Sequence, residues 1–73
     1  MPNYRPKKRS LTLNGHRTSV SLEDPFWEYF CKLAIKRNLS LNTLASEIDF
    51  ERNSNVGLAT SIRIFCLNDA QKC

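Results

Sequence analysis

Glycine and histidine are scarce in this 73-residue chain. Glycine occurs only twice, at Gly15 and Gly57, so the sequence contains no glycine-rich loop of the kind that cradles a phosphate. His16 is the only histidine, and it is not part of a Ser/His/acid set for nucleophilic catalysis. The sequence therefore predicts a protein that is not an enzyme.

Cysteine patterns that hold metals or form disulfide frameworks are also absent. The chain has three cysteines, an odd number without C-x-x-C spacing: Cys31, Cys66 and Cys73. A single histidine does not complete a usual zinc ligand set. We interpret the thiols as small apolar groups in a reduced, cytoplasmic protein without cofactors. With disulfides and metals set aside, a chain this short is expected to gain stability from a partner subunit.

Long hydrophobic runs are missing too. No window approaches the ~18 consecutive apolar residues of a membrane-spanning helix. The N-terminus is basic but is not followed by the apolar stretch of a secretory signal. We therefore expect no membrane association.

Positive charge is concentrated in the N-terminal quarter. The net charge is +4, and five cations precede the first acid: Arg5, Lys7, Lys8, Arg9 and Arg17. We expect residues 1–8 to form a basic flexible arm, and such an arm beside a polar strand favours a polyanionic partner. The alternative is a solvated tail that only aids solubility.

The segment from Arg17 to Leu22 alternates strictly between polar and apolar residues. Thr18, Val20 and Leu22 are expected on the core face of a strand. The opposite face carries Arg17, Ser19 and Ser21. One guanidinium and two short hydroxyls suit a crowded, negatively charged groove. An ordinary half-exposed strand is the alternative interpretation.

A second alternating segment, residues 9–13, precedes Asn14-Gly15. An Asn-Gly pair between alternating runs predicts a hairpin with a type I′ turn. Leu13 would then oppose His16 and Leu11 would oppose Thr18, which places both leucines on the core face. An irregular arm over residues 9–15 is the alternative.

Three helices are expected after the strand. Asp24 is predicted to cap a helix from Pro25 to Arg37, whose apolar residues cover about two thirds of its circumference and so favour a dimer. Ser40 is predicted to cap a second helix over 41–51. A third helix should cover 58–70, with Arg63 exposed and residues 71–73 forming a tail.

The start of the second helix combines polar side chains with the free N–H groups of a first turn. Ser40, Asn42 and Thr43 lie there, and such a terminus is suited to a phosphate. Plain helix capping is the alternative role of these side chains.

This order of elements resembles the ribbon-helix-helix family, the fold of the Arc and MetJ repressors. The resemblance is carried by the segments Gly15–Glu23, Phe26-Trp27, Leu39–Asn42, Glu47–Asp49 and Ser61–Phe65. They are similar to a bacterial subgroup with an appended third helix, and the resemblance covers about residues 9–68.

The resemblance implies a mainly α fold with a short β-ribbon, over residues 9–70, in a homodimer that pairs its strands. The ribbon would enter the major groove of double-stranded DNA with Arg17, Ser19 and Ser21 towards the bases. The residues implied or expected at phosphates are Ser40, Asn42, Thr43, Lys7, Lys8 and Arg9. If residues 9–13 also pair, the dimer sheet has four strands, and residues 9–13 must lie outside the groove or lift away.

The expected function is transcriptional regulation through DNA binding. The alternative is a protein-interaction module, an antitoxin-like or adaptor dimer whose ribbon no longer reads DNA. Salt dependence separates the two, because phosphate binding weakens steeply with salt.

Overall fold

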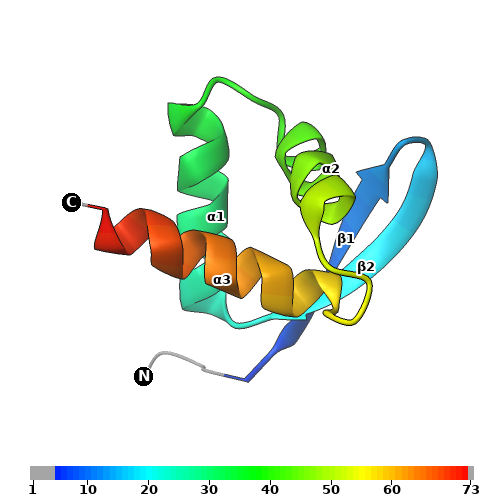
Figure 1. Ribbon diagram of the computed structural model, residues 1–73, viewed down its shortest axis with the longest axis horizontal. Helices are drawn as coiled ribbons and strands as arrows, with labels where there is room; N and C mark the ends of the chain where they lie inside the picture. The colour runs from blue at the N-terminus through cyan, green and yellow to red at the C-terminus, as the bar shows by residue number, and fades with distance from the viewer. Residues whose placement is uncertain (1–4, 73) are drawn as a thin grey trace.

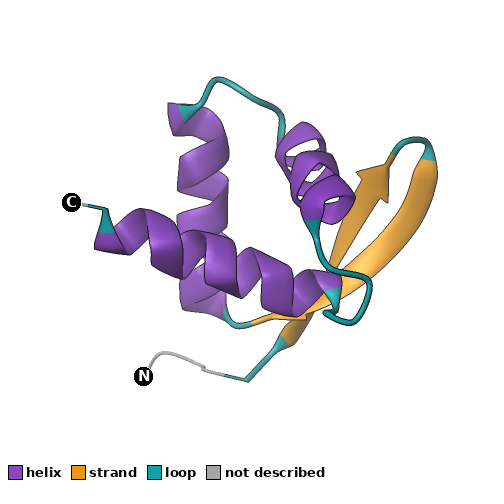
Figure 2. Cartoon of the chain, viewed as in Figure 1, coloured by secondary structure: helices purple, strands orange, loops and turns teal. Residues whose placement is uncertain are grey.

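The computed structural model describes residues 5–72. Within this range two strands precede three helices: β1 (Lys7–Leu13), β2 (His16–Leu22), α1 (Asp24–Lys36), α2 (Leu41–Glu51) and α3 (Leu58–Gln71) (Figure 1). The chain is mainly helical with one short antiparallel ribbon, which confirms the predicted fold class (Figure 2).

The ribbon is a hairpin closed by Asn14-Gly15. Both turn residues have positive φ, 51° and 83°, as a type I′ turn requires. Leu13 pairs with His16 and Leu11 with Thr18, so the predicted register is confirmed and the irregular arm is excluded. β1 already begins at Lys7, so the last two residues of the expected arm, 1–8, belong to the strand. Residues 1–4 of that arm lie outside the described residues.

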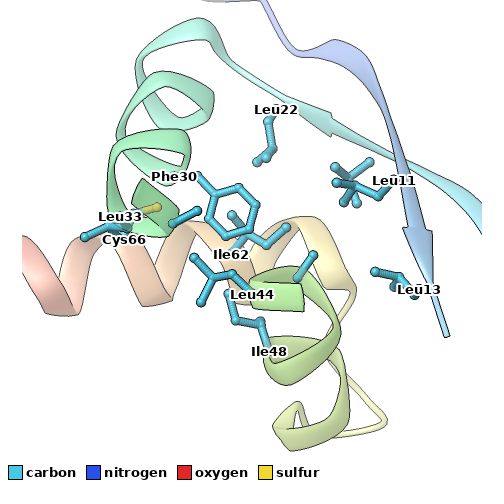
Figure 3. Close-up of a cluster of buried hydrophobic side chains, with 12 residues drawn as sticks. Leu11, Leu13, Leu22, Phe30, Leu33, Leu44, Ile48, Ile62 and Cys66 are labelled. Carbon is cyan, nitrogen blue, oxygen red and sulfur yellow. The ribbon is translucent and has the colours of Figure 1, made fainter. Parts of the chain in front are cut away.

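The helices cover one face of the hairpin and enclose a single core. Leu11 and Leu22 from the hairpin lie close to Phe30 of α1 and Leu44 of α2, and Ile62 of α3 completes the centre (Figure 3). Phe30 and Leu22 are fully buried. Each element contributes to this cluster, so the hairpin and the helices share one core.

Thr18 departs from the prediction that it faces the core. It lies on the helix-covered face but is exposed, whereas Val20 and Leu22 on the same strand are buried. The physical reason is that α2 packs against β1, while α3 reaches β2 towards its Leu22 end. The turn-proximal part of β2 is therefore left uncovered.

The start of α1 also differs by one residue from the prediction. Glu23, not Asp24, is the N-cap, and its side chain makes no capping hydrogen bond. Asp24 is the first helical residue and Pro25 follows within the first turn, where its missing N–H costs nothing. The helix ends at Lys36, and Asn38 with φ of 58° provides the left-handed residue that stops it.

α3 lies across α1 (Figure 1), and Ile62, Phe65 and Cys66 of α3 belong to or pack against the same core cluster as the apolar residues of α1. Phe26 and Trp27 of α1 pack against the common core, while Ile35 remains 79% exposed. The wide apolar surface of α1 therefore no longer requires a second chain by itself. α3 extends to Gln71, one residue further than predicted, so the expected tail at 71–73 begins inside the helix.

Arg63 of α3 is half-buried, which corrects the expectation that it is exposed. Its guanidinium donates to both carboxylate oxygens of Glu23, at 2.9 and 3.2 Å, and to the carbonyl oxygen of Ser21 at 3.1 Å. This fork ties the third helix to the junction of β2 and α1. Among the described residues, none of the helices is long and apolar enough to cross a membrane.

We predict that Ile62→Val lowers the free energy of unfolding by about 1 kcal/mol, because it removes one methylene from a fully buried side chain. Ile64→Val, two residues away on the same helix, is the matched control. Ile64 is 49% exposed, so its loss should stay within about 0.5 kcal/mol. Urea denaturation of both variants measures the difference, and equal losses would contradict the assigned orientation of α3.

Candidate nucleic-acid interface

One face of the hairpin carries only polar and basic side chains. β1 and β2 place them in three cross-strand pairs, and all six are exposed. We call the set Lys8, Ser10, Thr12, Arg17, Ser19 and Ser21 the polar face. None of its six members is an acid.

The two cations of the polar face lie near its opposite ends. Lys8 is opposite Ser21, and Arg17 is opposite Thr12 beside the turn, a separation of four residues or ~13 Å along the strands. Within residues 5–72 neither cation forms an ion pair. The face therefore offers two unneutralised charges with hydroxyl groups between them.

Lys7 and Arg9 alternate with Lys8 and lie on the other face of β1. The ammonium group of Lys7 is 3.1 Å from a carboxylate oxygen of Asp24. The Arg9 guanidinium bonds to the same carboxylate and lies 5.2 Å from the centre of the Trp27 ring. Both predicted phosphate contacts are thus occupied by an acid of the chain, and Arg9 anchors β1 to α1.

The first turn of α2 lies beside β1. Ser40 caps the helix, as predicted: its hydroxyl oxygen accepts a hydrogen bond from the Thr43 N–H at 3.0 Å, and the two hydroxyls are 2.7 Å apart. The Asn42 side-chain oxygen accepts from the N–H of Thr12 at 2.9 Å. These side chains join the hairpin to α2, and their predicted role at phosphate stays a prediction.

Two members of the polar face were not among the predicted site residues. Ser10 and Thr12 come from β1 and stand opposite Ser19 and Arg17. The alternation of residues 9–13 and the Asn-Gly turn already placed them on this face. The bond from Thr12 to Asn42 has no such signal, because it joins positions thirty residues apart.

Neighbouring cations lower the pKa values of the two acids at the start of α1. The Arg63 guanidinium, through its hydrogen bond, holds the pKa of the Glu23 carboxyl below its ordinary value. Hydrogen bonds from Arg9 and then Lys7 lower the pKa of Asp24 in the same way. These hydrogen bonds therefore favour the ionised form of both carboxylates, and the guanidinium groups of Arg9 and Arg63 offset the negative charges.

Of the two cysteines that the structure describes, Cys66 is buried in the core and Cys31 is partly buried. Burial raises the pKa of the Cys66 thiol to about 11, and burial also raises the pKa of Cys31. A thiol with a raised pKa is a weak nucleophile and a poor metal ligand at neutral pH. In the part of the chain that the structure describes, no group of three or more His, Cys, Asp or Glu side chains is placed to hold a metal ion.

The family model for the ribbon-helix-helix domain matches residues 6–70 of the chain. This match covers both strands and nearly all of the three helices, and the chain belongs to the ribbon-helix-helix family. The family has a DNA-binding, non-catalytic fold. Neither the curated proteins nor the solved structures contain a significant match.

We predict that Asp24→Asn makes the free energy of unfolding less sensitive to acid. The folded state lowers the pKa of Asp24, so the unfolded chain takes up this proton more readily. Its contribution is present above the ordinary pKa of about 3.9 and is lost as the pH falls through the lower folded value. Urea denaturation at pH values from about 5 down to about 2.5 measures the slope of the free energy of unfolding against pH.

The control for this experiment is Glu47→Gln, which removes an exposed acid of α2. It accounts for the loss of one negative charge without disturbing Lys7 or Arg9. If the free energy of unfolding of Asp24→Asn changes with pH as steeply as that of the unchanged protein, the pairing of Asp24 with the β1 cations is contradicted.

Proposed function

We propose that this protein is a bacterial, cytoplasmic transcriptional regulator that binds double-stranded DNA as a homodimer through its β-ribbon. The observation that carries the proposal is the acid-free polar face, with Lys8 and Arg17 unpaired among the described residues. Membership of a family with a DNA-binding fold supports it. Charged donors with short hydroxyls between them match a surface of phosphates and base edges.

In the proposed dimer β2 pairs with β2 of the partner subunit, because β1 already occupies its inner edge. The sheet then has β1 as its outer strand on both sides. Its outer strand axes are ~14 Å apart, which exceeds the ~12 Å width of the groove. Leu11 and Leu13 hold β1 in the core, so β1 does not lift away.

We therefore propose that the two β2 strands enter the groove and that the two β1 strands lie outside it, beside the phosphates at its edges. Arg17, Ser19 and Ser21 then face the bases. Lys8, on the outer strand, contacts phosphate. A residue at a base edge affects specificity, whereas a residue at phosphate affects affinity for every sequence equally. This difference makes the arrangement testable.

The remaining predicted phosphate contacts have uneven support. Ser40, Asn42 and Thr43 surround the first turn of α2, whose N–H groups favour an anion. Their hydroxyl and amide oxygens already accept hydrogen bonds within the chain. Lys7 and Arg9 share Asp24, so their proposed contribution is a weaker, longer-range attraction.

Base discrimination by this ribbon should be modest. Arg17 is the only residue of the proposed base-facing set whose side chain has the paired donors for a bidentate contact with guanine. Two serines accept or donate to any base, so they separate sequences poorly. We infer that part of the specificity comes from the shape and flexibility of the DNA.

A protein-interaction module is the second candidate function. The observation that favours it is Phe50 of α2, whose side chain is 90% exposed. An exposed aromatic ring suits a protein partner better than phosphate. An affinity for DNA that stays the same at every salt concentration would favour this candidate over the DNA-binding regulator.

We predict that Lys8→Gln and Lys7→Gln differ in their effect on DNA binding, although the lysines are adjacent. Lys8→Gln should weaken binding to all duplexes and reduce the slope of log K against log salt by about 0.9 for each chain in the complex. Lys7→Gln should change the slope much less, because Lys7 is paired with Asp24. Titrations of a random-sequence duplex at several salt concentrations measure both slopes. Equal slopes for the two variants count against the polar face as the DNA surface.

We further predict that Arg17→Ala weakens binding to the duplex preferred by the unchanged protein by about 1–3 kcal/mol per chain. Its effect on binding to random-sequence duplexes should be smaller. The preferred duplex is selected first from a randomised pool. Arg52→Ala is the control, since it removes an arginine that is bonded to Asp49 and Val56 outside the polar face. Unchanged affinity of Arg17→Ala for every duplex tested removes Arg17 from the site.

A further inference from the structure

The outer edge of β2 carries backbone groups that point away from β1. In a hairpin with a two-residue turn, the pair Leu13–His16 exchanges both N–H···O bonds, and bonded and non-bonded pairs alternate from there. The outward N–H of Thr12, which donates to Asn42, follows this alternation on β1. The outward residues of β2 are Arg17, Ser19 and Ser21.

One of these outward groups is already occupied. The Arg63 guanidinium donates to the Ser21 carbonyl oxygen at 3.1 Å and to Glu23 with its other nitrogen at 2.9 Å. It therefore lies where a partner strand would place its own donor. Within residues 5–72 the outward N–H and C=O groups of Arg17 and Ser19 have no strand beside them, since β2 pairs with β1 alone.

We propose that a second copy of the chain pairs with β2 in a register centred on Thr18, and that Arg63 sets this register. The inference rests on the homodimer of the proposed function and deepens it. Arg17 pairs with Ser19 of the partner subunit, and the two-fold axis repeats the pair. This gives about four ladder hydrogen bonds without the Ser21 carbonyl. Thr18 then faces Thr18 of the partner subunit.

The neighbouring two-fold registers are less favourable. Centring on Ser19 pairs Arg17 with Ser21 of the partner subunit, which needs the carbonyl that Arg63 occupies. Centring on Arg17 sets two guanidinium groups directly opposite each other, and like charges at opposed positions are destabilising. The Thr18-centred register avoids both, and it gives the exposed Thr18 a cross-strand partner on the helix-covered face.

Single cysteines distinguish the registers. In the Thr18-centred sheet, Thr18→Cys places two thiols on opposed residues ~4.5 Å apart between Cα atoms, within disulfide range. In the Ser19-centred sheet the same residues are ~8 Å apart, beyond the range. Ser19→Cys behaves in the opposite way. Both variants are made in a chain that also carries Cys31→Ser and Cys73→Ser. The same chain without an added cysteine is the control for background cross-linking.

The experiment compares the disulfide-linked fraction of the two variants under a mild redox buffer, with the mass in solution measured alongside. We expect the protein to be a dimer. The disulfide-linked fraction of Thr18→Cys should be about tenfold or more that of Ser19→Cys, because the Ser19-centred register requires the charge-assisted hydrogen bond from Arg63 to Ser21 to break. A dimer that cross-links equally or better through Ser19→Cys overturns the register but leaves the homodimer standing. A monomer overturns the homodimer together with the register.

The role of Arg63 is tested in the same background. Arg63→Ala frees the Ser21 carbonyl, so the share of Ser19→Cys cross-linking should rise at least severalfold relative to Thr18→Cys. If circular dichroism shows that Arg63→Ala is unfolded, Arg63→Lys replaces it, since lysine can keep the ion pair to Glu23 without the second donor arm. Arg52→Ala is the matched control. An unchanged ratio in the folded Arg63 variant contradicts the assigned role.

Discussion

The hairpin turn at Asn14-Gly15 sets which side chains of the ribbon enter the core and which face outward. Its two positive φ angles fix the register of β1 on β2, and a register shift of one residue would turn every side chain to the opposite face. The fixed register sends Leu11 and Leu22 into the helical core. The same register brings together an exposed face that has no acid. One turn thus determines both the core and the candidate binding surface.

Cations on the two faces of β1 have separate roles. Arg9 and Lys7 surround Asp24 and fasten the ribbon to α1, where Arg9 also lies against Trp27. Lys8, between them in sequence, points the other way. Arg63 acts similarly from α3, because it binds Glu23 and the end of β2 together. The ribbon is therefore held by ion pairs at one end and by α2 beside its turn.

Sequence alone predicted the order of elements, the hairpin register and the Ser40 cap, because each depends on local patterns of alternation or capping. It missed the interactions that join distant segments. The Arg63–Glu23 pair spans forty residues, and no periodicity indicates it. Thr18 was placed in the core by strand alternation, which determines the face of a residue but not whether a helix covers that part of the face. The wide apolar surface of α1 was correctly expected to need cover, and α3 of the same chain provides part of it. The DNA-facing roles depend on a partner molecule, so neither sequence pattern nor the fold of one chain determines them.

The proposed function depends on a dimer whose ribbon attracts DNA electrostatically. The most direct test is a titration of the unchanged protein with random-sequence duplex DNA at about 50 and 200 mM salt, with its mass in solution measured in the same buffers. We predict a dimer whose affinity for DNA falls by at least tenfold between the two salt concentrations. A protein without measurable affinity for DNA at the lower salt concentration would contradict the proposed function and would favour a protein partner instead.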